Sequence, residues 1–428
     1  MGNRTKFPKV FWAANTIEVF ERFAYYGIFM TFYAYMEFRG HSRSDLGTVQ
    51  SFFLFISYFI PVFSGTFADR FGFKKVLIIS YLAYIPSILL LMITKSMTGI
   101  TLTMLSIGLA AGMFKPLISG TVRLTTDSTN KTLGFGIFYM MVNVGGTLGP
   151  IIAGKLRAVS WNLAFIMAAL CITVMFIITL LFYKEPERDI NKTKVSEKIL
   201  EIFSTLTDGK FALFLLLLGL FFWLPFWGFF NICPAYVNDH LDTIKFYNGI
   251  EHVFGSGFAR ILSRNENGIW KINGEAIANT GWIILFFQVL ISRIFEKRRA
   301  IPSFMFGLLV AAAGFALIGY SINLLPAMVV MGIFIFAVGE MITSPRIQEY
   351  ITWIAPKEKA GLYMGSNFLA TCIGALLSGF IYTRLFGVFE KNNTPEYIWY
   401  ILGAHLILGM IVIYVFTKTL GEFKEQEK

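Results

Sequence analysis

Charged residues are scarce in this 428-residue sequence: Asp, Glu, Lys and Arg together make up 15% of it, and hydrophobic residues make up 56%. Soluble proteins keep about a quarter of their residues charged, so this composition excludes a surface that faces water on all sides. Phenylalanine is abundant instead, with 46 residues, and large apolar side chains suit a surface that faces lipid. The composition predicts an integral membrane protein.

The formal net charge of +11 is compatible with nucleic-acid binding when it is taken alone. The basic residues, however, lie between hydrophobic runs. Membrane proteins collect such residues in loops that face the cytoplasm and anionic lipid. We therefore expect the lipid bilayer to be a partner of this protein, and we expect no nucleic acid.

Histidine and cysteine, which often catalyse reactions or bind metals, are also scarce: the sequence has four histidines and three cysteines. The cysteines lie inside hydrophobic runs without the spacing of metal ligands, which is typical of small core residues; they are Cys171, Cys233 and Cys372. The histidines are dispersed, and no glycine-rich phosphate loop of the Walker type occurs. The sequence therefore predicts no enzyme, no metal site and no cofactor, and it argues against an ATP-driven pump.

Twelve stretches are apolar enough for a bilayer-spanning helix, which needs about 20 residues. They begin near Phe11, Leu46, Val76, Gly99, Gly134 and Trp161, and then near Phe211, Ile277, Ile301, Leu325, Ala360 and Tyr397. They predict an all-α polytopic membrane protein with twelve transmembrane helices in two six-helix halves, in the plasma or bacterial inner membrane. The first residues have no cleavable-signal pattern, so the first segment is expected to remain as a helix.

The basic residues between the segments predict the orientation, because they gather on the cytoplasmic side when both termini are placed there. The polar stretch 184–210 is then a cytoplasmic linker between an N-terminal bundle, 1–183, and a C-terminal bundle, 211–428. A second polar stretch, near 238–275, is expected to be an extracytoplasmic loop with some local structure, to which the sequence assigns no function.

Matching features in the two halves indicate an internal duplication. The fifth and eleventh segments each place Tyr and Asn four residues apart and follow them with glycines, which permit close helix approach. The pairs are Tyr139 with Asn143 and Tyr363 with Asn367. The fourth and tenth segments each hold an ionisable residue near a proline, Lys115 before Pro116 and Glu340 ahead of Pro345.

The first segment contains Glu18, Glu21 and Arg22, which share one face of a helix at 100° per residue. A charge in mid-bilayer costs about 2.5–3.5 kcal/mol, so such residues normally face a protein interior or a watery cavity. Two carboxylates beside one guanidinium leave a surplus negative charge, which either a proton or Lys115 would offset. We interpret this face as a proton carrier. The alternative is a static ion-pair network that joins helices.

Lys115 and Glu340 form an opposed pair, one in each half. A substrate with an amino and a carboxyl group suits this pair, with Arg22 and Lys115 for the carboxylate and Glu340 for the ammonium. The alternative is a salt bridge between Glu340 and Lys115 that never meets substrate. Further polar residues within apolar segments are either pocket walls or packing contacts, namely Tyr25, Tyr26, Asn143 and Asn279.

The connection between the second and third segments combines glycines, an acid and several bases. The residues of this connection that we predict to be functional are Gly65, Asp69, Arg70, Gly72 and Lys74. Positive charge that fixes topology explains the bases but not an acid at a helix end. We therefore predict a charge latch that gates the cytoplasmic side.

These motifs resemble those of the major facilitator superfamily and, within it, the proton-dependent oligopeptide transporters. The residues that carry the resemblance are Gly65 to Lys75, Glu18-x-x-Glu21-Arg22-Phe-x-Tyr25-Tyr26-Gly27, Phe138-Tyr139-x-x-Val-Asn143-x-Gly145, Lys115-Pro116 and Gly339-Glu340-x-x-x-Ser344-Pro345. The resemblance implies that Glu18 and Glu21 take part in proton coupling, and that Arg22 and Lys115 hold a peptide carboxylate. Glu340 and Asn279 would then meet the amino end of the peptide, and Tyr26 and Asn143 its backbone.

The function expected from this resemblance is proton-coupled symport of di- or tripeptides or peptide-like solutes by a monomer, with the proton gradient as driving force. Segment seven, however, has no acid between 211 and 237, where that family has a carboxylate. A facilitator or exporter of another amphoteric or anionic solute therefore stays open. A membrane sensor that does not transport is a third alternative, although the residues after Lys418 leave little room for a signalling domain.

Overall fold

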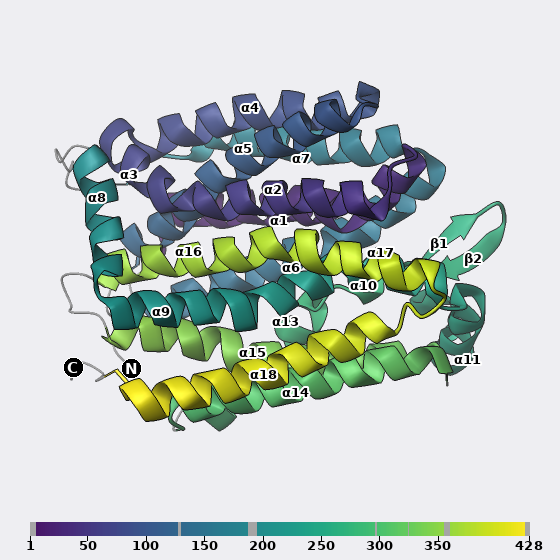
Figure 1. The fold of residues 1–428 in the computed structure, drawn as a ribbon. Helices are drawn as coiled ribbons and strands as arrows, with labels where there is room; N and C mark the ends of the chain where they lie inside the picture. Colours follow the sequence, from purple (N-terminus) through teal and green to yellow (C-terminus); the bar gives the residue numbers. More distant parts are fainter. Residues whose placement is uncertain are drawn as a thin grey trace. The chain divides into compact units, whose positions relative to one another are not determined.

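The computed structural model describes residues 6–126, 130–186, 195–295, 298–323, 325–354 and 360–423. Almost all of the described chain is helical (Figure 1). The helices of the first half are α1 (Lys9–Phe38), α2 (Arg43–Phe59), α3 (Pro61–Phe71), α4 (Phe73–Ile93), α5 (Met97–Leu124), α6 (Lys131–Val159) and α7 (Trp161–Phe182). Short connections join them, as a membrane bundle requires.

The second half is more interrupted. Its elements are α8 (Val195–Ser204), α9 (Gly209–Leu218), α10 (Leu224–His240), α11 (Thr243–Ile261), β1 (Ser263–Glu266), β2 (Ile269–Ile272), α12 (Gly274–Ile277), α13 (Gly281–Phe295), α14 (Ala300–Tyr320), α15 (Met328–Ile354), α16 (Ala360–Ser378), α17 (Arg384–Lys391) and α18 (Tyr397–Leu420). Single π-helical turns join α9 to α10, at Gly219–Trp223, and α16 to α17, at Gly379–Thr383. Each of these two pairs therefore forms one long, locally widened helix.

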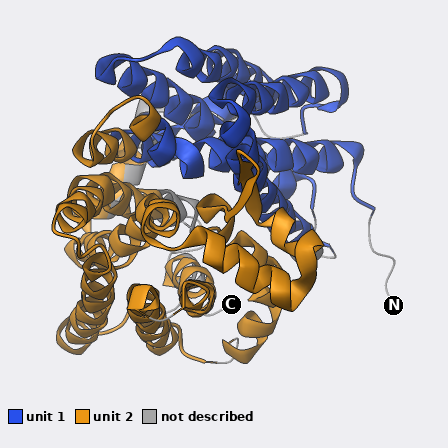
Figure 2. Cartoon of the chain, turned by 90° about the vertical axis from the view of Figure 1, so that its right-hand side faces the viewer, with its two compact units in different colours: residues 1–35, 52–199 blue, residues 36–51, 200–428 orange. Residues whose placement is uncertain are grey.

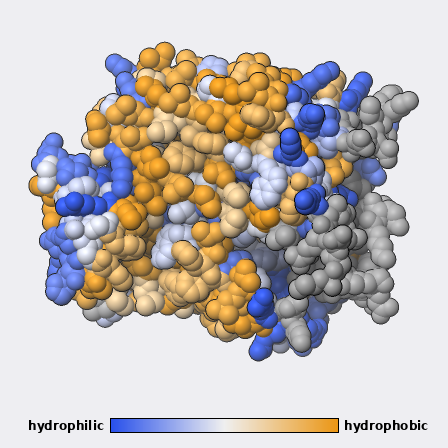
Figure 3. All heavy atoms as spheres, turned by 180° about the vertical axis from the view of Figure 1, so that it is seen from behind, coloured by the Kyte–Doolittle hydropathy of each residue, from blue (hydrophilic) through white to orange (hydrophobic). Residues whose placement is uncertain are grey.

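Within the described residues, eleven helical segments are long and apolar enough to cross a membrane. Helix α1 supplies the twelfth predicted span. It has 30 residues and falls outside the eleven because Glu18, Glu21 and Arg22 interrupt its apolar sequence. Apolar residues cover most of the surface in Figure 3, and polar residues gather toward its two sides. The predicted all-α membrane fold is confirmed, whereas the cytoplasmic placement of the termini stays a prediction.

Two compact units make up the chain (Figure 2). Unit 1 comprises residues 1–35 and 52–199, and unit 2 comprises residues 36–51 and 200–428. The segment 36–51 precedes most of the first bundle in sequence, but it packs in unit 2. One of the contacts that join it to unit 2 is a close backbone approach, since a Cβ at Gly47 would lie 2.3 Å from the carbonyl oxygen of Gly379. The bundle boundaries expected from the sequence differ from these units in this segment.

Glycines permit corresponding helix contacts in both units. In unit 1, a Cβ at Gly145 or Gly149 of α6 would lie 2.2 Å from a backbone oxygen of α1. In unit 2, a Cβ at Gly374 of α16 would lie 2.6 Å from the carbonyl oxygen of Gly219. The fifth span thus packs on the first as the eleventh packs on the seventh, which agrees with the predicted duplication.

Two stretches expected to be polar connections contain regular structure. The predicted linker, 184–210, includes α8, and the predicted loop near 238–275 includes α11 and the antiparallel hairpin of β1 and β2. Neither helix shows as an apolar run of spanning length, because polar residues alternate with the apolar ones along both.

Candidate functional site

The first cluster lies on α1 in unit 1, where Glu18, Glu21 and Arg22 are buried, with 0%, 0% and 8% of their surface exposed. Arg22 donates a hydrogen bond from Nε to Glu18 Oε1 at 2.6 Å. A terminal guanidinium nitrogen of Arg22 lies 3.2 Å from Glu21 Oε2. The structure therefore brings the three residues together as their helical spacing predicts.

This cluster leaves carboxylate oxygens without hydrogen bonds. Glu18 Oε2 and both oxygens of Glu21 are buried and have no hydrogen-bond partner among the described residues. A buried acceptor without a partner is costly, and more so when it is charged. A proton, a cation or a substrate group would each relieve that cost at Glu21.

Lys115 of α5 belongs to the same unit. Its Nζ donates to the carbonyl oxygen of Ser57 at 3.3 Å and lies over the rings of Tyr58 and Tyr25, at 4.0 Å and 4.6 Å from their centres. The charge of Lys115 also acts electrostatically on Glu21. Two carboxylates and two cations are thus combined in one buried region, with the faces of the tyrosine rings stabilising the ammonium.

Tyr26 and Asn143 lie where α1 and α6 meet. The Asn143 amide donates to the carbonyl oxygen of Tyr139 on its own helix at 2.8 Å. A Cβ at Gly146 would lie 3.3 Å from the ring of Tyr26. Both side chains therefore have packing roles in this conformation, and their predicted contact with substrate stays a prediction.

In unit 2, Glu340 of α15 faces a break in the eighth span. Thr280, which lies between α12 and α13, donates its hydroxyl to Glu340 Oε2 at 3.1 Å. The break has a local cause, because the side chain of Asn279 accepts a hydrogen bond from the backbone nitrogen of Gly281 at 2.8 Å and so caps the start of α13. Interrupted spans with capped ends are a common setting for solute sites in transporters.

Glu340 has no ion-pair partner among the described residues of its own unit. Lys115 belongs to unit 1, so the predicted opposition of these two residues stays a prediction. The sequence analysis did not identify Thr280 as a site residue. Its position directly after Asn279, a predicted site residue, was the feature that could have indicated it.

The connection between α3 and α4 turns at Gly72, whose φ of +100° favours glycine. Glu185, which follows α7, accepts hydrogen bonds from the backbone nitrogens of Phe73 and Lys74 at 2.8 and 2.9 Å. The Nζ of Lys74 donates to the carbonyl oxygen of Leu180 at 3.0 Å. The connection is thus tied to the end of α7, through an acid that sequence reasoning overlooked because it directly follows an apolar run.

Other predicted members of this loop are less informative. Arg70 is exposed and stacks near its neighbour Phe71. A Cβ at Gly65 would only touch Pro116, at 4.0 Å. The side chain of Asp69 lies outside the described residues, so the acid of the proposed latch stays a prediction.

A further cluster in unit 2 also escaped the sequence analysis. Arg43, at the start of α2, pairs with Glu37, Asp239 and Glu390 at 2.8, 2.7 and 2.9 Å. The Nε2 of His240 lies 2.8 Å from Glu390 Oε1. Each residue lies at the end of an apolar segment. A charge at such a position is usually interpreted only as a determinant of the orientation of the span in the membrane. The cluster brings together three loops that the sequence predicts on one side of the membrane.

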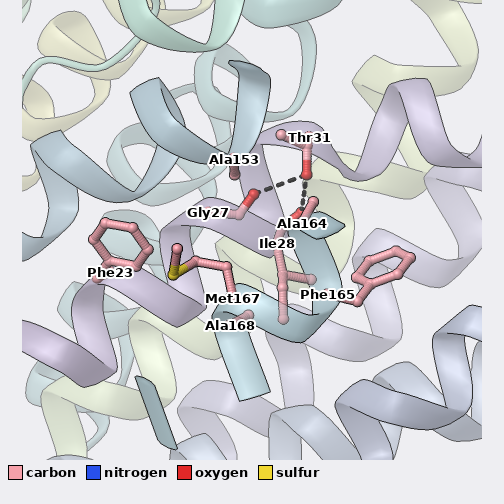
Figure 4. Close-up of a pocket in the computed structure, with 9 residues that line it drawn as sticks. All are labelled: Phe23, Gly27, Ile28, Thr31, Ala153, Ala164, Phe165, Met167 and Ala168. Atoms are coloured by element: carbon pink, nitrogen blue, oxygen red, sulfur yellow. Dashed lines mark hydrogen bonds between the residues drawn. The ribbon is translucent and has the colours of Figure 1, made fainter. Parts of the chain in front are cut away.

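Unit 1 also contains an apolar pocket among α1, α6 and α7 (Figure 4). Its lining residues are Phe23, Gly27, Ile28, Thr31, Ala153, Ala164, Phe165, Met167 and Ala168. Among these side chains, that of Thr31 carries the hydroxyl group. This hydroxyl already donates a hydrogen bond to the carbonyl oxygen of Gly27 at 2.8 Å. The pocket offers a solute no free polar group among these side chains, so the charged clusters stay the candidate substrate site.

Comparison with solved structures supports the fold. A POT family transporter in complex with a thioalcohol-conjugated peptide has a TM-score of 0.74 and 20% identity, over 96% of both chains. The peptide transporter POT in complex with sulfate has a TM-score of 0.77 and 18% identity, over 98% of this chain and 96% of the other. The nucleoside transporter NupG has a TM-score of 0.75 and 14% identity, over 95% and 99%.

Curated relatives cover most of the chain at low identity. The quinolone resistance protein NorA of Staphylococcus aureus (strain MSSA476) is 24% identical over 392 residues, which is 92% of each chain. A Na(+), Li(+), K(+)/H(+) antiporter of Planococcus maritimus is 23% identical over 78% of this chain and 86% of the relative. The sequence profile of the Major Facilitator Superfamily matches residues 16–379. With these matches and its spanning helices, the chain is a multi-pass membrane transporter, not an enzyme, and belongs to the Major Facilitator Superfamily.

Proposed function

We propose that the protein is a secondary transporter that couples the entry of protons to the uptake of di- or tripeptides or peptide-like solutes by alternating access. The observation that supports this most is the buried charge cluster of Glu18, Glu21 and Arg22 with Lys115 within electrostatic reach. The solved structures with similar folds include proteins described as peptide transporters, which agrees with the first-helix motif.

Charge balance connects this cluster to coupling. Glu18, Glu21, Arg22 and Lys115 carry two negative and two positive charges, so the region is neutral when it is empty and fully ionised. A substrate carboxylate bound by Lys115 and Arg22 would add a third negative charge in a poorly solvated place. A proton on Glu21 would restore neutrality, because its oxygens have no hydrogen-bond partner among the described residues. Substrate carboxylate and proton would therefore bind together.

Glu340 is suited to the other end of the substrate. Its carboxylate accepts a hydrogen bond from Thr280 but has no ion-pair partner among the described residues of unit 2. A substrate ammonium would offset its charge and add charge-assisted hydrogen bonds. In this proposal Asn279 keeps the eighth span broken beside Glu340. Tyr25 positions the ammonium of Lys115, and Tyr26 and Asn143 contact the substrate backbone after a rearrangement at the contact of α1 and α6.

The test is uptake of a labelled dipeptide by proteoliposomes with an imposed pH gradient, inside alkaline. We expect the wild type to accumulate the dipeptide only when the gradient is present. Glu21→Gln should lose this accumulation but still exchange dipeptide across the membrane. Glu251→Gln is the matched control, because Glu251 belongs to α11 of unit 2, is not a member of the cluster, and accepts a hydrogen bond from Tyr247. Gradient-dependent uptake by Glu21→Gln at the wild-type rate would refute this assignment of the proton site.

Substrate class has a separate test. Thermal stabilisation of the purified protein is measured against dipeptides, amino acids and organic anions. We expect stabilisation by dipeptides that Arg22→Ala abolishes. Stabilisation by organic anions alone would exclude a peptide substrate.

A facilitator or exporter of another amphoteric or anionic solute is the second candidate. Two observations favour it: the curated relatives include a protein named for quinolone resistance, and residues 211–237 contain no acid. The acid that follows, Asp239, is engaged by Arg43 at 2.7 Å. Counterflow of a solute at full rate without any pH gradient, together with unchanged transport in Glu21→Gln, would favour this candidate over symport.

A further inference from the structure

The insert between the seventh and eighth spans carries a surface that the transport proposal does not use. Helix α11 buries Phe246, Tyr247 and Ile250 along its first half. Further along, its large apolar side chains are exposed instead. They are Val253, Phe254, Phe258 and Ile261, which we call the α11 patch, with 69%, 65%, 46% and 51% of their surface exposed.

The α11 patch is continuous although the helix is kinked. Gly255 has a φ of +83° and interrupts the helix in the middle of the patch. The rings of Phe254 and Phe258 nevertheless lie on either side of this kink with their centres 5.4 Å apart. Ile261 follows Phe258 by three residues, and so lies on the same side of the helix. Four neighbouring large apolar groups that face outward would be costly to keep in water.

The insert is rigidly attached, so its position is defined within unit 2. Asn238 at the end of α10 donates to Glu275 at 3.2 Å and accepts from the backbone nitrogen of Gly274 at 3.0 Å. Arg264 of β1 donates to the same asparagine and also to Glu266. Trp270 of β2 stacks on Tyr247 of α11 at 6.1 Å between ring centres. The hairpin therefore fixes α11 to the ends of two spans.

The connection lengths then place α11 at the surface of the bilayer. Two residues, Leu241 and Asp242, separate the end of α10 from the start of α11. Three Cα steps reach at most about 11 Å, so α11 begins close to the level at which a span leaves the hydrocarbon. In Figure 1, α11 runs at a steep angle to α14 and α18 and not along them. Apolar groups exposed at this level suit the headgroup and upper acyl region of a bilayer.

We propose that α11 is a membrane-surface helix, with the α11 patch seated in the headgroup and upper acyl region of the bilayer around unit 2. Helices of this kind bury their apolar face about 5–10 Å below the surface. Residues 241–275 contain four basic and four acidic side chains, which sum to zero. The attraction is therefore apolar, and anionic lipid adds little. Seated in this way, α11 would fix the depth at which α10 ends.

The experiment attaches a nitroxide spin label to Phe258→Cys in liposomes of zwitterionic lipid. Collision with oxygen, which concentrates in lipid, is compared with collision with a water-soluble nickel chelate. The control is Asn248→Cys, an exposed polar position on the same helix. The native cysteines are buried, so labelling is selective. We expect the ratio of oxygen to nickel collisions to be severalfold higher at 258 than at 248, and unchanged when anionic lipid is added.

Two outcomes would overturn the proposal. Equal nickel accessibility at 258 and 248 would mean that the α11 patch faces water. Spin–spin broadening at 258 that disappears on dilution with unlabelled protein would mean that a second copy covers the patch. A second label at Val253→Cys keeps the test independent of folding defects at position 258. Transport activity is not part of the readout, so the result does not depend on the substrate.

Discussion

The guanidinium of Arg43 donates two hydrogen bonds to the carboxylate of Glu390, at 2.9 and 3.0 Å, although the residues are 347 positions apart. This bidentate geometry is the strongest form of an arginine–carboxylate pair. Glu37 and Asp239 also contact the same guanidinium. One guanidinium therefore contacts three carboxylates, and the imidazole of His240 also lies beside Glu390. The cluster holds residues 36–51 within unit 2.

Replacing Arg43 with glutamine is expected to destabilise unit 2 by about 3 kcal/mol, because three carboxylates lose their shared cation in a mostly buried place. The measurement is the thermal unfolding midpoint in detergent. Glu390→Gln should have a smaller effect, and the double variant should lose less than the sum of the two, because the residues form one interaction. Strict additivity would show that the pair contributes nothing.

The control for Arg43 is Arg384→Gln. Arg384 is exposed and donates to Thr48, so it also joins the segment 36–51 to the eleventh span. An exposed contact of this kind is expected to change stability by less than about 0.5 kcal/mol. Equal losses in both variants would attribute the effect to a general loss of positive charge.

Gly145→Ala tests the close approach of α6 to α1. The new Cβ would lie 2.2 Å from the carbonyl oxygen of Val19 and 2.8 Å from the Cβ of Arg22. A backbone atom cannot move aside as a flexible side chain can, so we expect a loss of about 1–3 kcal/mol. Gly136→Ala on the same helix meets nothing within 4 Å and should be neutral or slightly stabilising. Equal melting temperatures for both variants would contradict the packing described here.

Thr280→Val tests whether the hydroxyl supports Glu340. The variant keeps the shape of the side chain and removes the hydrogen bond to the carboxylate. If Glu340 binds the substrate ammonium, dipeptide affinity should fall by about 1 kcal/mol, roughly fivefold in Kd. Thr280→Ser keeps the hydroxyl and should restore the affinity. Calorimetric titration measures both, and identical Kd values for all three proteins would remove Thr280 from the site.

The sequence predicted the fold well because a bilayer requires every spanning helix to have about the same apolar length, roughly 20 residues. Every predicted span coincides with a helix of the described chain, and the glycines that follow Asn143 and Asn367 lie at close helix contacts. For the insert, the sequence predicted a loop with some local structure but identified neither its helix nor its hairpin. Its helix mixes polar and apolar residues, and its hairpin has strands of only four residues, 263–266 and 269–272. Neither produces a pattern strong enough to stand out from a loop.

The candidate site was predictable where local spacing determines contacts. Glu18, Glu21 and Arg22 meet because they are neighbours on one helix. Arg43 and Glu390 could not be paired in advance, because each resembles an ordinary charge at the end of a span and only the tertiary packing joins them. The same holds for Glu185, whose role as the cap of α4 depends on where α7 ends.

The hairpin of the insert is expected to lose stability in acid through Glu266. Burial raises the pKa of this carboxyl, but hydrogen bonds from Arg264 and Lys271 outweigh burial and lower the pKa from 4.5 to about 2. A group whose pKa is lowered by folding stabilises the fold fully above its unfolded pKa, and this contribution disappears as the pH falls through the folded value. The hairpin should therefore weaken progressively between about pH 4.5 and pH 2.

Hydrogen exchange of residues 263–272, corrected for the intrinsic dependence of exchange on pH, measures this effect. Protection in the wild type should be constant from pH 7 to pH 5 and then decrease. Glu266→Gln should have lower protection at pH 7 and should lack the decrease, because it cannot ionise and so no longer forms ion pairs with Arg264 and Lys271. A decrease of the same size in Glu266→Gln would assign the acid sensitivity to another group in the insert.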